Sequence, residues 1–180
     1  MSTRLDLPTI QDQTAFNLDR WDEVCADPVW AGFDGRVETD AYGQVIMNYP
    51  AEFGHGGRQF HLGTLLSQHL PLGKVTVECP ISTSEGVKVA DVVWVSQKRL
   101  LKITGRKALN AAPEICVEVL SPSNKRGEIE GKMKLYFEAG AKEVWVCDLS
   151  GSLRFFLKKA PTTAAKASVV CPNMPLRLDA

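Results

Sequence analysis

The sequence predicts an α/β fold in which strands buried on both faces are combined with amphipathic helices. Residues 89–95 and 115–120 form nearly continuous runs of Val, Ile and Leu, as inner strands of a sheet do. Apolar residues recur at helical spacing over 55–70 and 128–139, and Gly140 supplies a C-terminal cap after the second segment. Together these runs indicate a sheet covered by helices.

Length and composition indicate an ordinary globular protein. The 180 residues are 44% hydrophobic and 23% charged, which suits a single domain spanning residues 1–180. Because 21 basic residues balance 21 acidic ones, any site for a polyanion must be a local patch. The five cysteines lack CxxC spacing, and we find neither a signal peptide nor an apolar run long enough for a membrane span. We therefore expect a cytoplasmic protein with no membrane partner.

The remaining elements are less regular. In chain order we expect a helical extension over 1–30, a hairpin over 36–48, strands over 74–79, 143–149 and 153–157, and over 158–180 an exposed loop and a C-terminal strand. The extension is predicted from the helical spacing of Phe16, Trp21 and Val24. Ser123 or Asn124 is expected to cap the helix over 128–139.

Two acidic residues interrupt the buried strands. Asp91 lies within the first apolar run and Glu118 within the second. A carboxylate buried without a partner costs several kcal/mol or stays protonated, so each acid needs a partner. If the two strands are neighbours in the sheet, one divalent cation held by both carboxylates relieves their repulsion.

A lysine on the following helix completes a chemical set. On a helical wheel, Lys132 falls at the border of the core-facing stripe, whereas Lys134 points away from it. The helix can therefore carry Lys132 back toward Glu118. Asp91 and Glu118 would hold Mg²⁺ or Mn²⁺, which activates a water molecule, while the ammonium orients that water or stabilises the transition state. This is the minimum set for phosphodiester hydrolysis.

Several motifs in a fixed order resemble a known family. They are Val37-Glu-Thr-Asp-Ala-Tyr-Gly-Gln-Val-Ile-Met47, His55 with Gln59, Thr83-Ser-Glu-Gly86 leading to Val89-Ala-Asp91-Val92, Pro113-Glu-Ile-Cys-Val-Glu118-Val-Leu-Ser-Pro-Ser-Asn124, and Lys132-Met-Lys-Leu-Tyr136-Phe-Glu-Ala-Gly140-Ala followed by Glu143-Val-Trp-Val146. In these motifs the chain resembles the Uma family of bacterial proteins, part of the PD-(D/E)xK nuclease superfamily. The resemblance covers most of the chain.

The resemblance implies a restriction-endonuclease-like core, with a mixed central sheet flanked by helices and an N-terminal hairpin and helix. Asp91 matches the superfamily's metal-binding aspartate, Glu118 the acid of its E-x-K element, and Lys132 a lysine that the family keeps on the next helix. Leu120 stands where the E-x-K lysine would be, so catalysis depends on Lys132 taking over its role.

Four further residues are candidates for supporting roles, and three of them have a structural alternative. Glu38 is either a third ligand or part of a hairpin salt bridge, and His55 either touches phosphate or lies on the surface or at a helix cap. Gln59 matches a family position one turn after His55. Glu128, four residues before Lys132, either supports the site or only steadies the helix.

Two cations follow the second acid. Lys125 and Arg126 come soon after Glu118 and are expected to contact the backbone of a nucleic acid.

We therefore expect a Mg²⁺- or Mn²⁺-dependent endonuclease acting on nucleic acid, DNA being the expected substrate. Cutting a duplex needs two active sites, so a homodimer is expected. An alternative is a catalytically inactive protein that keeps the fold as a nucleic-acid-binding or protein-interaction module, with Glu118 and Lys132 as a structural pair. A third is a metal-dependent hydrolase of a small phosphorylated substrate.

Overall fold

The computed structural model describes residues 10–48, 53–103, 107–124 and 127–178. Within them the helices are α1 (Gln13–Ala26), α2 (Pro28–Ala31), α3 (Phe53–His69), α4 (Gln97–Leu100) and α5 (Glu128–Glu138). The strands are β1 (Arg36–Thr39), β2 (Val45–Asn48), β3 (Gly73–Thr83), β4 (Gly86–Ser96), β5 (Ile115–Val119), β6 (Glu143–Cys147), β7 (Leu153–Leu157) and β8 (Ala160–Ala165).

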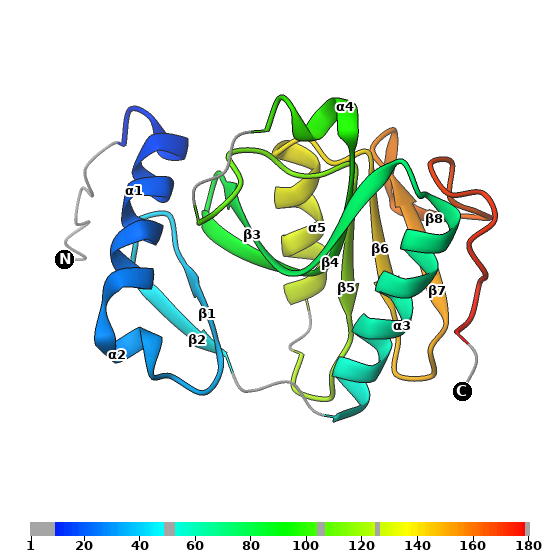
Figure 1. The fold of residues 1–180 in the computed structure, drawn as a ribbon, viewed down its shortest axis with the longest axis horizontal. Coiled ribbons are helices and arrows are strands. Elements are labelled where there is room, and N and C mark those ends of the chain that lie inside the picture. The colour runs from blue at the N-terminus through cyan, green and yellow to red at the C-terminus, as the bar shows by residue number, and fades with distance from the viewer. Residues whose placement is uncertain (1–9, 49–52, 104–106, 125–126, 179–180) are drawn as a thin grey trace, which may run out of the picture.

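The central feature is a mixed six-stranded sheet in the order β3-β4-β5-β6-β7-β8 (Figure 1). Among these six strands, only β5 and β6 pair in parallel, and α5 forms the crossover between them. The other neighbours are antiparallel, including β4 and β5. The prediction of a mixed sheet is thus confirmed, and the strands that carry Asp91 and Glu118 are adjacent.

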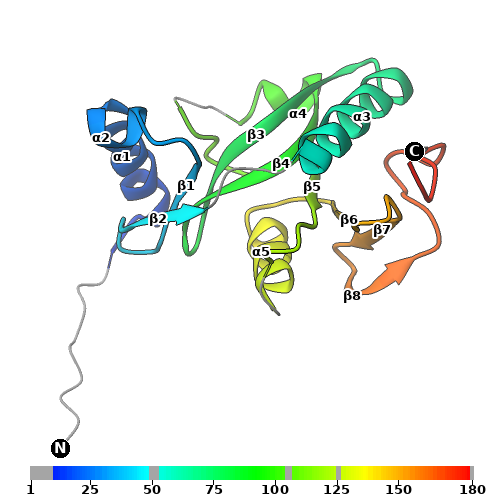
Figure 2. The ribbon, with the colours of Figure 1, turned by 90° about the horizontal axis from the view of Figure 1, so that it is seen from below.

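Helices cover both faces of this sheet (Figure 2). On one face, Leu62 and Leu66 of α3 pack with Val92 and Val117. On the other face, residues of α5 pack in a second cluster that includes Val93 and Cys116 from the same two strands. Adjacent residues of the inner strands therefore face different helices, as the period of two in a strand requires.

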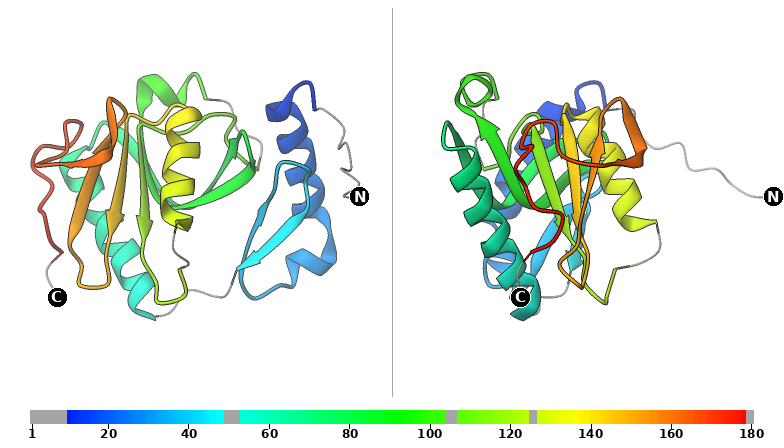
Figure 3. Two further views of the ribbon diagram at one scale, coloured as in Figure 1. Left: turned by 180° about the vertical axis from the view of Figure 1, so that it is seen from behind. Right: turned by 90° about the vertical axis from the view of Figure 1, so that its right-hand side faces the viewer.

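The first four elements gather at one end of the molecule, as seen from behind in Figure 3. Asn17 of α1 donates hydrogen bonds to Ser82 Oγ at 2.9 Å and to the Thr83 carbonyl at 2.8 Å. Trp21 packs in a small cluster with Val87, also from the β3-β4 hairpin. The predicted helix and hairpin are present, and their attachment to the β3-β4 end fixes β1 beside the sheet.

Three local predictions are wrong. Residues 160–165, expected in a loop, form β8, an exposed edge strand that lacks an apolar alternation because neither of its faces is buried. Within the described residues, no strand follows β8. The N-cap of α5 is Gly127, whose φ of 82° lies in the left-handed region, rather than Ser123 or Asn124. Asn124 instead accepts a hydrogen bond from the amide of Ser121, which closes the turn after β5.

Candidate active site

Asp91 lies where β4 and β5 begin to separate. The ladder pairs Val92 with Val117, so the next residues along the two strands are Asp91 and Glu118. Asp91 Oδ2 accepts a hydrogen bond of 2.6 Å from the backbone amide of Val119, immediately after Glu118. The Asp91 side chain is 1% exposed and is thereby held against β5.

The other oxygen of Asp91 is surrounded by donors from β1 and α3. Oδ1 lies 3.2 Å from His55 Nε2 and 3.2 Å from Gln59 Nε2, and it also accepts from Arg36. His55 and Gln59 are one turn apart on α3, and both are buried. The surface position considered for His55 is wrong, because its side chain is buried and faces Asp91.

Glu78 on β3 belongs to the same group and was not identified from the sequence. It lies between Val77 and Cys79, whose ladder partners Val92 and Ala90 flank Asp91, and its φ of 48° is in the left-handed region that non-glycine residues rarely adopt. Its carboxylate accepts from Arg36 Nη2 at 2.6 Å and from Gln59. His55, Glu78 and Asp91 each offer a ligand atom, and these atoms all lie within 4.8 Å of one another. We call these three residues the acid-histidine cluster.

A second group lies on the α5 side of the strands. Lys132 Nζ is 2.7 Å from Glu38 Oε1, 3.5 Å from Glu118 Oε2 and 3.3 Å from the Val89 carbonyl. Tyr136 donates a 2.7 Å hydrogen bond to the other oxygen of Glu118. We call Glu38, Glu118, Lys132 and Tyr136 the lysine cluster. Lys132 reaches inward as predicted, whereas Lys134 has a 74% exposed side chain.

Glu38 has a role in both strand attachment and charge pairing. Its Oε1 accepts the amide of Val89 at 2.9 Å, so it fastens β1 to β4, and it also pairs with Lys132. Lys88 of β4 lies nearby, but its Nζ donates a hydrogen bond to the Thr39 carbonyl rather than to a carboxylate. Glu38 therefore lies in the site and not in a salt bridge confined to the hairpin.

The two strand acids have opposite electrostatic environments. Burial alone would raise the pKa of Asp91, but the hydrogen bond from His55 and the charge of Arg36 outweigh it and hold that pKa well below its usual range. Burial raises the pKa of Glu118 to about 8, since the attraction of Lys132 offsets burial only in part and the charge of Asp91 adds to the rise. Asp91 is thus ionised at neutral pH, whereas Glu118 readily holds a proton.

The ion pairs leave an excess of negative charge when all the acids are ionised. Arg36 is shared by Glu78 and Asp91, and Lys132 is shared by Glu38 and Glu118. Four carboxylates therefore face two cations among these pairs. One divalent cation would neutralise the difference.

The donor set of the acid-histidine cluster fits such an ion. Two carboxylates and an imidazole are ligands that Mn²⁺ accepts, whereas Mg²⁺ prefers oxygen alone. Asp91 and His55 are buried, and the second nitrogen of His55, Nδ1, is also buried with no hydrogen-bond partner in the described part of the chain. Glu118 is not a member of this group. It lies opposite Asp91 on the neighbouring strand, with its oxygens directed to Tyr136 and Lys132.

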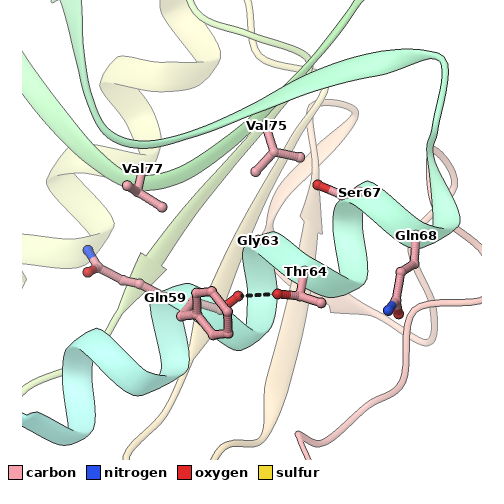
Figure 4. A pocket seen from close by; sticks show the side chains of 8 residues that line it. Gln59, Gly63, Thr64, Ser67, Gln68, Val75 and Val77 are labelled. Atoms are coloured by element: carbon pink, nitrogen blue, oxygen red, sulfur yellow. Dashed lines mark hydrogen bonds between the residues drawn. The ribbon is translucent and has the colours of Figure 1, made fainter.

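A shallow groove of about 460 Å³ lies between α3 and β3 (Figure 4). Its lining is polar along the helix, with Gln59, Thr64 and Ser67, and apolar on the strand side, with Val75 and Val77. Gln59 lines the groove and also donates hydrogen bonds to Asp91 and Glu78 of the acid-histidine cluster. The groove and the acid-histidine cluster are therefore joined through Gln59.

Of the remaining predicted residues, one lies at the edge of the site and two lie outside the described residues. Glu128, in the first turn of α5, accepts a hydrogen bond of 3.4 Å from Asn124. Lys125 and Arg126 lie outside the described residues, so their contact with nucleic acid remains a prediction.

The fold, together with paired acids and a buried lysine at the opening of two inner strands, defines a nuclease-like α/β protein. The model of the Uma2 family, described as "Putative restriction endonuclease", matches residues 21–165. The chain belongs to this family.

The fold is shared with a solved structure from a cyanobacterium. A crystal structure described as "a putative nuclease belonging to DUF820 from Anabaena variabilis ATCC 29413" superposes with a TM-score of 0.70. The identity is 14%, and the alignment covers 87% of this chain and 93% of that one. A comparison with curated proteins gives no match. In the described residues, no helix has both the length and the apolar character needed to cross a bilayer.

Proposed function

We propose that the protein is a metal-dependent endonuclease that hydrolyses phosphodiester bonds in DNA. The observation that carries this proposal is the convergence of ligand atoms from His55, Glu78 and Asp91 within 4.8 Å of one another, with Glu118 and its partner Lys132 opposite Asp91 on the neighbouring strand. Membership of a family described as restriction endonucleases supports the reaction class.

The chain's own residues would divide the work. Asp91 and Glu78, with His55, would hold Mn²⁺ or Mg²⁺, and Glu118 would join them once its proton is lost. The cation would polarise the phosphate and lower the pKa of a bound water. Lys132 would then orient the water or neutralise charge on the phosphate, which is the role that Leu120 cannot fill. Tyr136 and Glu38 hold Glu118 and Lys132 in place.

The presence of an imidazole in the donor set sets a metal preference. Because nitrogen ligands suit transition metals better than Mg²⁺, we expect Mn²⁺ to bind more tightly than Mg²⁺ and to support faster cleavage. Exchanging His55 for Asn should narrow this difference between the two ions.

The test is nicking of supercoiled plasmid in Mn²⁺, with EDTA as the metal-free control. Asp91→Asn and Glu118→Gln should each lower the rate at least about a hundredfold. Glu130→Gln, the same acid-to-amide change at an exposed position of α5, should leave it unchanged. Nicking that survives both site substitutions would refute the assignment of the site. Light scattering of the same samples tests the homodimer that duplex cutting implies.

One observation favours the alternative of an inactive nucleic-acid-binding module. Both oxygens of Asp91 and of Glu118 already accept from protein donors, so neither carboxylate needs an ion to satisfy its hydrogen bonding. Such a protein would retain DNA on a filter with equal strength in EDTA and in Mn²⁺, and Asp91→Asn would not alter the retention. It would not nick plasmid.

A further inference from the structure

Arg36 occupies the two acids that the proposed metal site would use. Its Nη2 lies 2.6 Å from Glu78 Oε1, and the same nitrogen donates to Asp91 Oδ1. Both acids belong to the acid-histidine cluster, in which the ligand atoms lie within 4.8 Å of one another. One nitrogen atom of Arg36 therefore sits between the two carboxylates.

The surrounding structure fixes the position of Arg36. Its side chain is 18% exposed, and it starts from β1, which is fastened to β4 through Glu38. Its second partner, Glu78, holds its carboxylate there from a backbone conformation that costs free energy for a residue with a side chain. A surface ion pair would not need such a conformation.

A divalent cation cannot lie between these two acids while the guanidinium is there. The two would fill the same space, and both carry positive charge. We infer that Arg36 is an internal counter-cation, which competes with the metal for Glu78 and Asp91 and is released as a phosphate-binding residue when the metal is bound. This inference rests on the proposed metal-dependent function.

The released arginine has the right chemistry for the substrate. A guanidinium binds phosphate oxygens with two parallel hydrogen bonds, and it stays charged at any pH at which the protein is folded. Arg36 is partly exposed, so its head can turn from the acids to a bound anion without unfolding β1. The acids would thus be charge-paired before metal binds, and the arginine would serve the substrate afterwards.

The first measurement is calorimetric titration of the whole protein with Mn²⁺ alone. Arg36→Ala and Arg36→Gln remove the competing charge, so the Kd for Mn²⁺ should fall at least about tenfold in both. Arg36→Gln keeps a hydrogen-bond donor near the acids and guards against loss of folding. Arg154→Ala is the matched control: it removes a cation from β7, where the guanidinium lies 5.9 Å from the Phe156 ring, and should leave the Kd unchanged.

The second measurement is anisotropy of a labelled DNA duplex in Ca²⁺, at a concentration that saturates the site, so that binding is measured without turnover. Both Arg36 variants should bind the duplex at least about fivefold more weakly than the wild type, although they bind metal more tightly. An unchanged Kd for Mn²⁺ in both variants would overturn the competition, and unchanged duplex binding would overturn the phosphate role. If the wild type binds no Mn²⁺ at all, the proposed function itself fails, and the two failures are thereby distinguished.

Discussion

The raised pKa of Glu118 makes the pH dependence of metal binding a sharp test of whether this residue is a ligand. Burial raises its pKa to about 8, and only the ionised carboxylate binds a cation well. Below pH 8 each metal ion that Glu118 binds must therefore displace a proton. The ionisation of Glu118 should by itself raise the apparent affinity for Mn²⁺ by about fiftyfold between pH 6 and pH 8, after which this contribution levels off.

The assay is calorimetric titration with Mn²⁺ at several pH values, on the wild type and on Glu118→Gln. Asp91 stays ionised throughout this range because its pKa is held low, so it adds no slope. Glutamine does not titrate, and the variant should lose most of the rise in affinity between pH 6 and pH 8. Equal pH profiles for the two proteins would refute the reasoning, because Glu118 would then be no ligand or would already be ionised.

The same shift has a consequence for stability without metal. A carboxyl group whose folded pKa exceeds its unfolded value of about 4.3 destabilises the protein increasingly as the pH rises above that unfolded value. Glu118→Gln should therefore unfold at a higher urea concentration than the wild type at pH 8, and the two should converge near pH 4. Saturating Mn²⁺ should reduce the difference at pH 8.

Three further predictions concern the buried polar contacts. Tyr136→Phe removes a 2.7 Å hydrogen bond to Glu118, so it should lower the free energy of unfolding by about 1.5–3 kcal/mol in urea titrations at pH 8. It should also move the pH profile of Mn²⁺ binding to higher pH. An unmoved profile would contradict a role of this hydrogen bond in the ionisation of Glu118. Lys132→Met leaves Glu38 and Glu118 without their shared cation and should cost about 3–5 kcal/mol at pH 8 but less at pH 6, where Glu118 is protonated; an equal cost at both pH values would exclude this coupling. Glu143 accepts hydrogen bonds from Trp145, Ser168 and two backbone amides, and Glu143→Gln replaces this carboxylate with a weaker acceptor. The free energy of unfolding should drop by about 1–3 kcal/mol while plasmid nicking is retained. A loss of nicking in folded protein would contradict a purely structural role.

The sequence predicts the core of the fold because its signals are strong there. Apolar runs over β4 and β5, and the helical spacing over α3 and α5, are set by burial and survive in the structure. The edge strand β8 carries no such signal, because exposed Ala and Thr residues on an outer strand do not alternate with apolar ones. The cap at Gly127 depends on backbone conformation, which composition alone does not determine.

The candidate site is predictable only in part. Burying a carboxylate costs free energy, so an acid within an apolar run is a candidate site residue. This criterion identifies Asp91 and Glu118. Glu78 lies in a half-exposed stretch of β3 with no unusual pattern, and its role follows from a positive φ that turns its carboxylate toward Asp91. No sequence pattern identifies Arg36 either. Its contacts arise only when the hairpin folds against β4, through a pairing that joins distant segments of the chain.

The central claim is that β3, β4 and α3 together present a binding site for a divalent cation. Anomalous diffraction from a crystal soaked in Mn²⁺ tests it most directly, because the ion itself is located. We predict one strong peak within about 2.0–2.6 Å of oxygens from Asp91 and Glu78, next to His55, with Arg36 turned away from both acids. A crystal without a peak at these residues, and with Arg36 still bound to them at saturating Mn²⁺, would contradict the claim.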